Sequence, residues 1–406
     1  MAVSRNTRRP SGRFWSKTLT DVKEGIYIER WSISSDELGI GEKWCFDKRR
    51  LHGGLSDGVD IITVSNGELS FVVVPTRGMG VWKGEYKGVF LGWESPVKEL
   101  VNPQYLNLEA RGGLGWLDGF NEWVVRCGLG NFGGSGFDVI KDNTGRKKKV
   151  MLTLHGKIAN IPASVVRVKI GLNPPFELRV EGVVHERAMF GTNLRLTTAV
   201  TTTLGSNSLK ISDTIENLRG VTDEMQILYH CNYGHPFLEE GARLVGPIKL
   251  VAPRNSMAAE GIDNYGIFGP SQSGFVEQVY FMELLADNRG RTKTMLVGKD
   301  ETKAVSISFS VKELPCFTLW KNTAALEDGY VTGLEPGTSF PNPKPFERQK
   351  NRVIRLEPGE KYCSEVVLSA HLGKDEVQKV YSQMEKIRGK TKPVVLKEPV
   401  PDFSPV

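Results

Sequence analysis

Short runs of β-branched and aromatic residues, each closed by a tight turn, recur through most of this chain. Pairs of such runs flank turn signals rich in Asn, Gly and Pro, which are typical of β-hairpins. Four hairpins are predicted in this way, at residues 59–64 with 69–74, 81–86 with 89–93, 165–172 with 177–185, and 194–204 with 209–215. Single strands are expected at residues 279–283, 293–297, 304–311, 316–321 and 365–369. So many strands with so little helical periodicity favour a mainly β fold, a large antiparallel β-sandwich or barrel, over a βαβ fold.

The two ends of the chain differ from this central region. Apolar residues recur with helical spacing over residues 375–387, which predicts one helix packed on the sandwich. Four prolines beyond residue 389 predict an extended tail. We therefore expect a loosely ordered basic arm at residues 1–20, one β-sandwich domain at residues 21–373, and a C-terminal helix with a proline-rich tail at residues 374–406.

Composition excludes several classes of protein. The chain has 406 residues, of which 39% are hydrophobic and 25% charged, so it can bury a sizeable core. No apolar run approaches the ~18 residues that a membrane span needs, and the basic N-terminus lacks the apolar stretch of a secretion signal. The net charge of +6 is mild, and the basic run at residues 146–149 follows a turn signal, which indicates a solvated turn. We expect a cytoplasmic protein that binds neither nucleic acid nor membranes, in an oligomeric state that the sequence leaves open.

The five cysteines are widely spaced and include no Cys-x-x-Cys pair. Neither a disulfide framework nor a zinc site is implied, and reduced thiols fit best. We expect no metal and no cofactor.

A glycine-rich segment at residues 128–133 matches the dinucleotide-binding pattern G-x-G-x-x-G and follows a predicted strand. The residues after it, Gly134-Ser135-Gly136-Phe137-Asp138, are poorly suited to open a helix. Without a helix N-terminus there is no dipole to hold a pyrophosphate. We interpret the segment as a glycine-rich loop.

Histidines at strand ends are the first candidates for chemistry. His155 and the pair His230 and His235 stand where predicted strands run into loops marked by Gly or Pro, and Glu335 stands at a similar junction. Such junctions are where a rigid scaffold presents side chains to a cleft. Imidazoles and a carboxylate suffice to move protons on and off sugar oxygens. Taken singly, each histidine is more often a hydrogen-bonded structural residue, and Glu335 is more often a surface acid in a turn.

The order of several segments resembles the aldose 1-epimerase (galactose mutarotase-like) superfamily, closest to a branch known mainly as a domain of unknown function. The matching segments are residues 115–120 and 125–128, His155-Gly156, residues 212–218, residues 230–234 and Glu335-Pro336. Together they cover roughly residues 50–370. The resemblance implies a large antiparallel β-sandwich whose concave face binds a sugar.

The resemblance also implies residue roles. Glu335 would remove the proton from the anomeric hydroxyl, and His230 would protonate the ring oxygen. His155 would bind the sugar and support the charge shift, and Arg126 would bind a hydroxyl or an anionic group. The sugar would be a small-molecule partner, and no cofactor would be needed.

Further candidates surround this set. The polar side chains expected to bind sugar hydroxyls are those of Asp118, Glu122, Asn160, Asn232, His235 and Lys321. Asp263 could occupy the place of an aspartate that the family often carries. Arg77 could face the cleft and suit an acidic or phosphorylated sugar, or be a buried structural arginine. Trp116, Trp123 and Trp320 could stack on a sugar ring or belong to the core.

Three functions stay open, of which we predict the first: an aldose 1-epimerase-like enzyme that interconverts sugar anomers by general acid–base catalysis. The second is an isomerase, epimerase or lyase that acts on a keto-sugar or an acidic sugar, with Arg77 and Arg126 holding a carboxylate. The third is a carbohydrate-binding module without catalysis.

Overall fold

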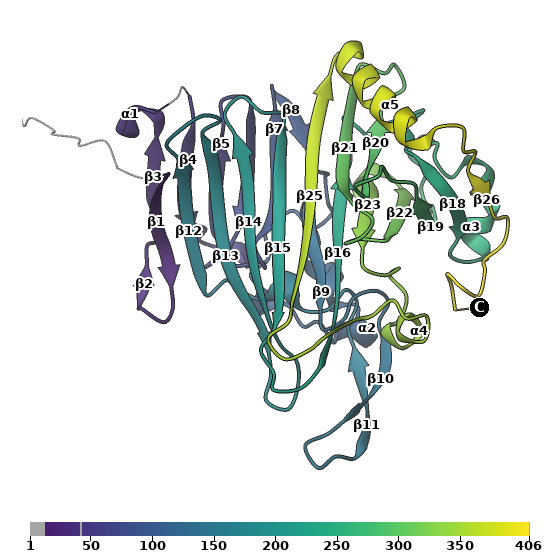
Figure 1. Cartoon of the computed structure of the whole chain (residues 1–406), viewed down its shortest axis with the longest axis horizontal. Helices are drawn as coiled ribbons and strands as arrows, with labels where there is room; N and C mark the ends of the chain where they lie inside the picture. The colour runs from purple at the N-terminus through teal and green to yellow at the C-terminus, as the bar shows by residue number, and fades with distance from the viewer. Residues whose placement is uncertain (1–12, 41–42, 406) are drawn as a thin grey trace, which may run out of the picture.

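A computed structural model describes residues 13–40 and 43–405. Two large antiparallel sheets pack face to face and account for most of these residues (Figure 1). The first sheet has ten strands, in the spatial order β17 (Arg243–Val245), β20 (Arg291–Val297), β21 (Lys303–Ser310), β25 (Lys361–Leu372), β15 (Ser208–Asn217), β14 (Asn193–Thr203), β13 (Glu177–Arg187), β12 (Val165–Gly171), β1 (Phe14–Asp21) and β2 (Ile26–Tyr27). Its long strands alternate buried and more exposed residues, as expected when one face covers a core and the other faces solvent.

The second sheet has fourteen strands. Twelve lie in the order β26 (Val394–Val395), β18 (Ile248–Pro253), β19 (Gln278–Leu284), β22 (Cys316–Thr323), β23 (Tyr330–Gly337), β16 (Asp223–Tyr233), β9 (Val124–Leu129), β7 (Gly80–Tyr86), β6 (Leu69–Val74), β5 (Asp60–Ser65), β4 (Cys45–Arg50) and β3 (Trp31–Ser34). Two short strands, β8 (Val89–Leu91) and β24 (Ile354–Leu356), pair with β7 and β16. In β9, β16 and β23 nearly every residue is buried, because loops cover the face of this sheet that points away from the first.

The four predicted hairpins and the C-terminal helix are confirmed. Each predicted pair of runs forms neighbouring antiparallel strands, β5–β6, β7–β8, β12–β13 and β14–β15. The helix α5 (Lys374–Arg388) packs Val377, Val380 and Met384 against β20 and β21. The other helices are short: α1 (Ser35–Leu38), α2 (Ala110–Gly113), α3 (Ser256–Glu260) and α4 (Lys344–Gln349). No helix among the described residues is long and apolar enough to cross a membrane.

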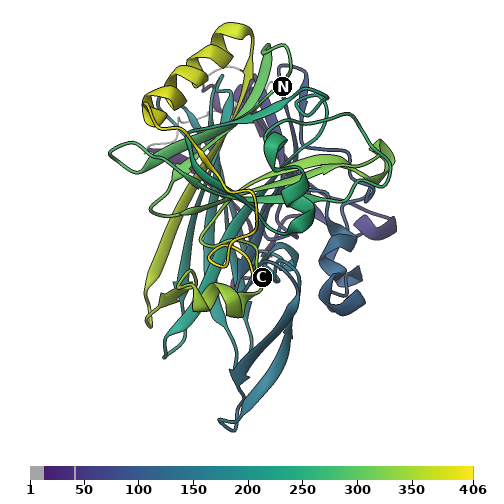
Figure 2. The ribbon, with the colours of Figure 1, turned by 90° about the vertical axis from the view of Figure 1, so that its right-hand side faces the viewer.

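The chain ends lie differently from the expected arm and tail. Residues 1–12 of the predicted arm are outside the described part, whereas the rest of it forms β1, which pairs with β12 along most of its length. In the tail, β26 pairs in parallel with β18, and Phe403 packs on Phe340. Figure 2 shows the C-terminal segment running back along the molecule from α5. Apolar side chains between the polar and proline residues hold both segments against the sheets.

A two-stranded hairpin, β10 (Gly136–Lys141) and β11 (Lys147–Leu152), projects from the lower end of the sandwich in Figure 1. Its turn is closed by Asp142, whose carboxylate accepts bonds from the backbone N–H groups of Thr144 and Arg146. The basic run at residues 147–149 is exposed on this hairpin. The predicted turn is therefore present, and it lies away from the candidate site described next.

Candidate functional site

The site is built on β16, at the middle of the second sheet. Successive side chains of a strand point to opposite faces. Tyr229 and Cys231 point into the core between the sheets, so His230 and Asn232 point to the outer face. Because β16 is fixed by β9 on one side and β23 on the other, the position of His230 is fixed on both sides.

Glu335 on β23 faces His230 on the same side of the sheet. The two side chains are 2% and 6% exposed, and His230 Nε2 lies 3.0 Å from Glu335 Oε1. The distance allows proton transfer, although the groups are not aligned as a regular hydrogen bond. Gly333 provides the space, because a Cβ atom there would lie 2.3 Å from Glu335 Oε1 and 3.1 Å from His230 Cε1.

Asn232 fixes the tautomer of His230. Its Nδ2 donates to the backbone oxygens of Glu122, at 2.9 Å, and His230, at 3.2 Å, so its Oδ1 must face the imidazole. That oxygen lies 2.5 Å from His230 Nδ1 and can only accept, which places a proton on Nδ1. In the neutral imidazole, Nε2 is therefore the unprotonated nitrogen that faces Glu335. Asn232, predicted to bind substrate, instead positions His230.

Burial shifts the pKa values of both members of the pair. It raises the pKa of Glu335 well above its usual range; Glu277 raises it further, and Arg254 lowers it. It lowers the pKa of His230 to about 4, against smaller opposing effects of Asn232 and Glu277. Both shifts favour the neutral forms. The neutral pair holds one proton, on Glu335, opposite the unprotonated Nε2 of His230.

Aromatic rings surround the pair. The ring centroids of Phe120 and Trp320 lie 5.2 and 5.3 Å from that of His230, and the centroid of His155 lies 5.5 Å away. Trp116 contacts His155 edge-on, with 4.7 Å between the two ring centroids. His155 and Trp320 are half-buried, so they mark the side on which the pair is nearest to solvent. Burial, and then the proximity of His230, lowers the pKa of His155, which keeps it neutral.

The glycine-rich loop at residues 128–133 holds the backbone of His155 through hydrogen bonds. The backbone N–H of Gly128 donates to His155 O at 3.1 Å, and the N–H of His155 donates to Gly133 O at 2.9 Å. Gly156 packs so closely that a Cβ atom there would lie 2.1 Å from Asn131 O. The strand β10 follows the loop, as the interpretation against a dinucleotide site requires. The glycines allow the close approach of two backbone segments.

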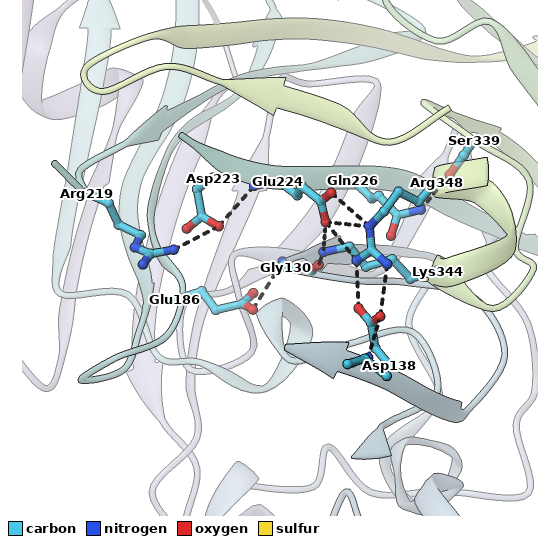
Figure 3. A network of polar contacts seen from close by, with 11 residues as sticks. Gly130, Asp138, Glu186, Arg219, Asp223, Glu224, Gln226, Ser339, Lys344 and Arg348 are labelled. Carbon is cyan, nitrogen blue, oxygen red and sulfur yellow. Dashed lines mark hydrogen bonds and ion pairs between the residues drawn. The ribbon is translucent and has the colours of Figure 1, made fainter. Parts of the chain in front are cut away.

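A network of charged side chains surrounds this loop (Figure 3). Glu186 accepts bonds from Leu129 N at 2.7 Å and Gly130 N at 3.2 Å, while Lys344 Nζ donates to Gly130 O at 2.7 Å. Arg348 of α4 pairs with Glu224 and with Asp138 at the base of the hairpin. The network thus connects the loop to β13, β16 and α4, and through the loop it supports His155.

Arg126 is not part of the site, which corrects the predicted role. It points to the opposite face of β9, between the two sheets, and is 1% exposed. Its Nε lies 2.5 Å from Asp213 Oδ2 on β15, and its other nitrogens donate to Asp213, Thr198 Oγ1 and the backbone oxygens of residues 78 and 79. Arg126 therefore ties the two sheets together and has no donor left for a substrate.

Arg77 is also a framework residue. Its guanidinium donates to Glu122 Oε1 at 2.6 Å and to the backbone oxygens of Val101 and Gly119, both at 2.9 Å. Glu122 is fully buried, and its backbone oxygen anchors Asn232. Of the two interpretations from the sequence, the buried structural arginine is the one that the structure supports.

The other candidates have partners elsewhere or lie at the surface, apart from Asn160. Lys321 points to the opposite face from Trp320 and donates to the backbone oxygens of Asn264 and Ile267, in a setting where burial lowers its pKa to about 8. The exposed carboxylates of Asp118 and Asp263 pair with Arg111 and Lys397, and His235 is exposed beyond the end of β16. Asn160 follows His155 on a half-buried turn, and within the described residues its amide atoms have no partner.

Sequence reasoning missed Phe120, Glu277 and Arg254. Phe120 lies within a segment used for the resemblance, but an aromatic residue in a loop carries no signal of what it packs on. Glu277 accepts a bond from Trp320 Nε1 at 2.7 Å and one from Arg254 at 2.8 Å. These contacts join residues far apart in the sequence, so no local pattern could indicate them.

No group of three or more potential metal ligands occurs in the described part of the chain.

Comparison with known proteins identifies the family. The model of a family described as a domain of unknown function, DUF4432, matches residues 56–370. The chain belongs to this family. A crystal structure from Klebsiella pneumoniae subsp. pneumoniae MGH 78578, of a protein proposed to be an aldose 1-epimerase, is 37% identical, with a TM-score of 0.90 over 95% of this chain and 99% of that one. The comparison with curated proteins finds no match.

More distant structures share the fold of this DUF4432 member. A galactose mutarotase-like protein from Clostridium acetobutylicum is 17% identical, with a TM-score of 0.54 over 80% of this chain and 98% of that one. A protein from Escherichia coli K12, also proposed to be an aldose 1-epimerase, is 15% identical, with a TM-score of 0.52 over 78% and 100%. The suspected superfamily, its branch of unknown function and the β-sandwich fold are therefore confirmed.

Proposed function

We propose that this protein interconverts the anomers of an aldose or aldose derivative by general acid–base catalysis, with Glu335 as base and His230 as acid. The observation that carries the proposal is the buried His230–Glu335 pair, in which Nε2 and Oε1 lie 3.0 Å apart; burial favours the neutral form of both groups, which leaves one proton to the pair. Aromatic rings beside the pair suit the apolar face of a sugar ring. The names of the similar structures point to the same kind of reaction.

The proposed cycle uses that one proton. It moves from Glu335 to His230 Nε2, which leaves a carboxylate and an imidazolium. Glu335 then removes the proton from the anomeric hydroxyl while His230 donates its proton to the ring oxygen, so the ring opens to the aldehyde. Rotation about the C1–C2 bond turns the other face of the carbonyl to the ring hydroxyl. Closure reverses both transfers and leaves Glu335 as a carboxylate and His230 as an imidazolium; the imidazolium proton then returns to Glu335, so the pair ends as it began.

Neighbouring residues support the substrate in this proposal. His155 Nδ1, Trp116 Nε1 and the amide of Asn160 are buried polar atoms that find no partner within the described residues. Such atoms require a hydrogen-bonding partner, and sugar hydroxyls provide both donors and acceptors. The site therefore fits a polyhydroxylated ligand.

The two other functions have less support. An isomerase or lyase for acidic sugars was expected to hold the carboxylate with Arg77 and Arg126, but both are engaged in the framework. A binding module without catalysis needs the aromatic rings but not a proton-sharing pair.

Anomer exchange, measured by one-dimensional NMR on neutral, acidic and phosphorylated sugars, tests which of the three functions the protein has. Saturable line broadening without exchange would support the binding module and contradict the proposal.

The rate of exchange should rise above about pH 4 to a plateau that ends where Glu335 loses its proton. On the acid side it should fall near pH 4, because His230 then carries a proton while Glu335 keeps its own, and no base is left. On the alkaline side it should fall once Glu335 loses the only proton of the pair, well above the usual range of a carboxyl group. Rates corrected for spontaneous mutarotation check this. An acid limb near the ordinary histidine pKa of about 6.5 would contradict it.

Gly333→Ala should reduce exchange by about 100-fold, because its methyl group would displace the Glu335 carboxyl group, and displacements of about 1 Å can cost this much. Gly220→Ala is the matched control, since a Cβ atom at Gly220 meets nothing within 4 Å. Exchange rates and thermal melting of both variants make the test. Full activity in Gly333→Ala would show that the pair need not keep its position.

A further inference from the structure

Glu277 lies just before β19 and uses both of its carboxylate oxygens. Oε2 accepts a bond from Trp320 Nε1 at 2.7 Å, and Oε1 accepts one from Arg254 at 2.8 Å. Trp320 is on β22, and Arg254 follows β18, so the three residues come from three neighbouring strands. Glu277 is 44% exposed, which places this chain of contacts at the outer edge of the buried site.

Trp320 connects Glu277 to the buried pair, because its ring lies against His230. Its ring centroid lies 5.3 Å from that of His230, at an interplanar angle of 67°, and 6.0 Å from that of Phe120. The indole N–H is the only polar group on this ring. Its bond to Glu277 therefore fixes how the ring plane is turned against His230.

We propose that Glu277 is a positioning residue, which holds the Trp320 indole against His230 and is itself held by Arg254. This inference rests on the proposed function of the His230–Glu335 pair, and it adds a residue that touches neither member of the pair. Three observations support it: the two hydrogen bonds of Glu277, the position of its partners on neighbouring strands, and the contact of Trp320 with His230.

The charge of Glu277 gives a readout that a merely structural role would not produce. The charged groups that shift the pKa values of the pair are Glu277 and Arg254 at the strand ends, and His155 faces His230 from the segment after β11. The thiols of Cys127 and Cys231 are neutral, because burial raises their pKa values. Glu277 raises the pKa of both Glu335 and His230, so removing its charge should lower both.

Two variants separate position from charge. Glu277→Gln keeps an acceptor for the indole N–H, so the ¹⁵N–¹H signal of Trp320, assigned with Trp320→Phe, should stay near its position. Both limbs of the pH profile of exchange should then move to lower pH. Glu277→Ala loses the bond as well, so the Trp320 signal should shift and kcat should fall about tenfold. Glu283→Gln is the matched control, because Glu283 lies near the other end of β19 and pairs at the surface with Lys249 of β18.

The outcomes are distinct. An unchanged Trp320 signal in Glu277→Ala would overturn the positioning role, and an unmoved pH profile in Glu277→Gln would overturn the role of the charge. If the wild-type protein shows no anomer exchange with any sugar, the proposed function fails. The Trp320 signal still tests the positioning role in that case, because it needs no substrate.

Discussion

Replacing Glu335 with glutamine should lower the rate of anomer exchange by about 10²–10⁴-fold, the usual contribution of a general acid–base group. Glutamine has nearly the same shape as a protonated glutamic acid but can neither take up nor release the proton. Binding of the sugar, followed by protein-induced line broadening, should persist. One-dimensional NMR on the same panel of sugars gives both quantities.

The same variant should keep its fold. Because the folded protein raises the pKa of Glu335, the unfolded chain releases this proton at a lower pH than the folded one. The residue therefore favours folding less at neutral pH than at acid pH, because its stabilising effect is lost as pH rises from the unfolded to the folded pKa. Glu335→Gln should then melt no lower than the wild type at pH 7. Glu327→Gln, an exposed acid in the turn before β23, is the control for activity. Full exchange in Glu335→Gln would remove Glu335 from the mechanism.

Arg126→Met should lower the free energy of unfolding by about 3–5 kcal/mol, because it leaves the Asp213 carboxylate buried without its partner. Urea unfolding followed by circular dichroism measures this change. Removing both charges, in Arg126→Met with Asp213→Asn, should recover part of the loss. Lys249→Met, which breaks an exposed pair with Glu283, should cost less than about 1 kcal/mol.

This series also tests whether Arg126 binds substrate. If it only joins the sheets, the doubly substituted protein should keep the KM of the wild type once it is folded. A loss of less than 1 kcal/mol in Arg126→Met together with a large rise in KM would instead place the guanidinium in contact with the sugar.

The sequence predicted the fold well because hairpin signals are local. An Asn-Gly turn between two β-branched runs determines which strands pair, and four such hairpins imply a large antiparallel sheet. The helix at residues 375–387 was equally clear, since its apolar residues follow one periodicity. The first strand was missed, because residues 14–21 carry polar residues that pair at the edge of a sheet.

The site was only partly predictable. Glu335, His230 and His155 lie together as the resemblance implied, but Arg126 and Lys321 point away from them. Along a strand with one solvated face, polarity alternates and shows which side chains face outward. In β9, nearly all residues are buried on both faces, so this signal is absent. Segment order could locate the strand but not the direction of its arginine.

The strand that carries His230 has a consequence for synthesis of the chain. In the finished protein β16 lies between β9 and β23, yet β23 follows it by about a hundred residues, which a ribosome adds in roughly 5–20 s. During this interval a long strand, most of whose residues are buried in the folded protein, has one open edge, a template for pairing with other chains. A central part of the sheet thus stays without one of its neighbours during this interval, and aggregation in the cell should depend on how quickly the last third of the protein is made.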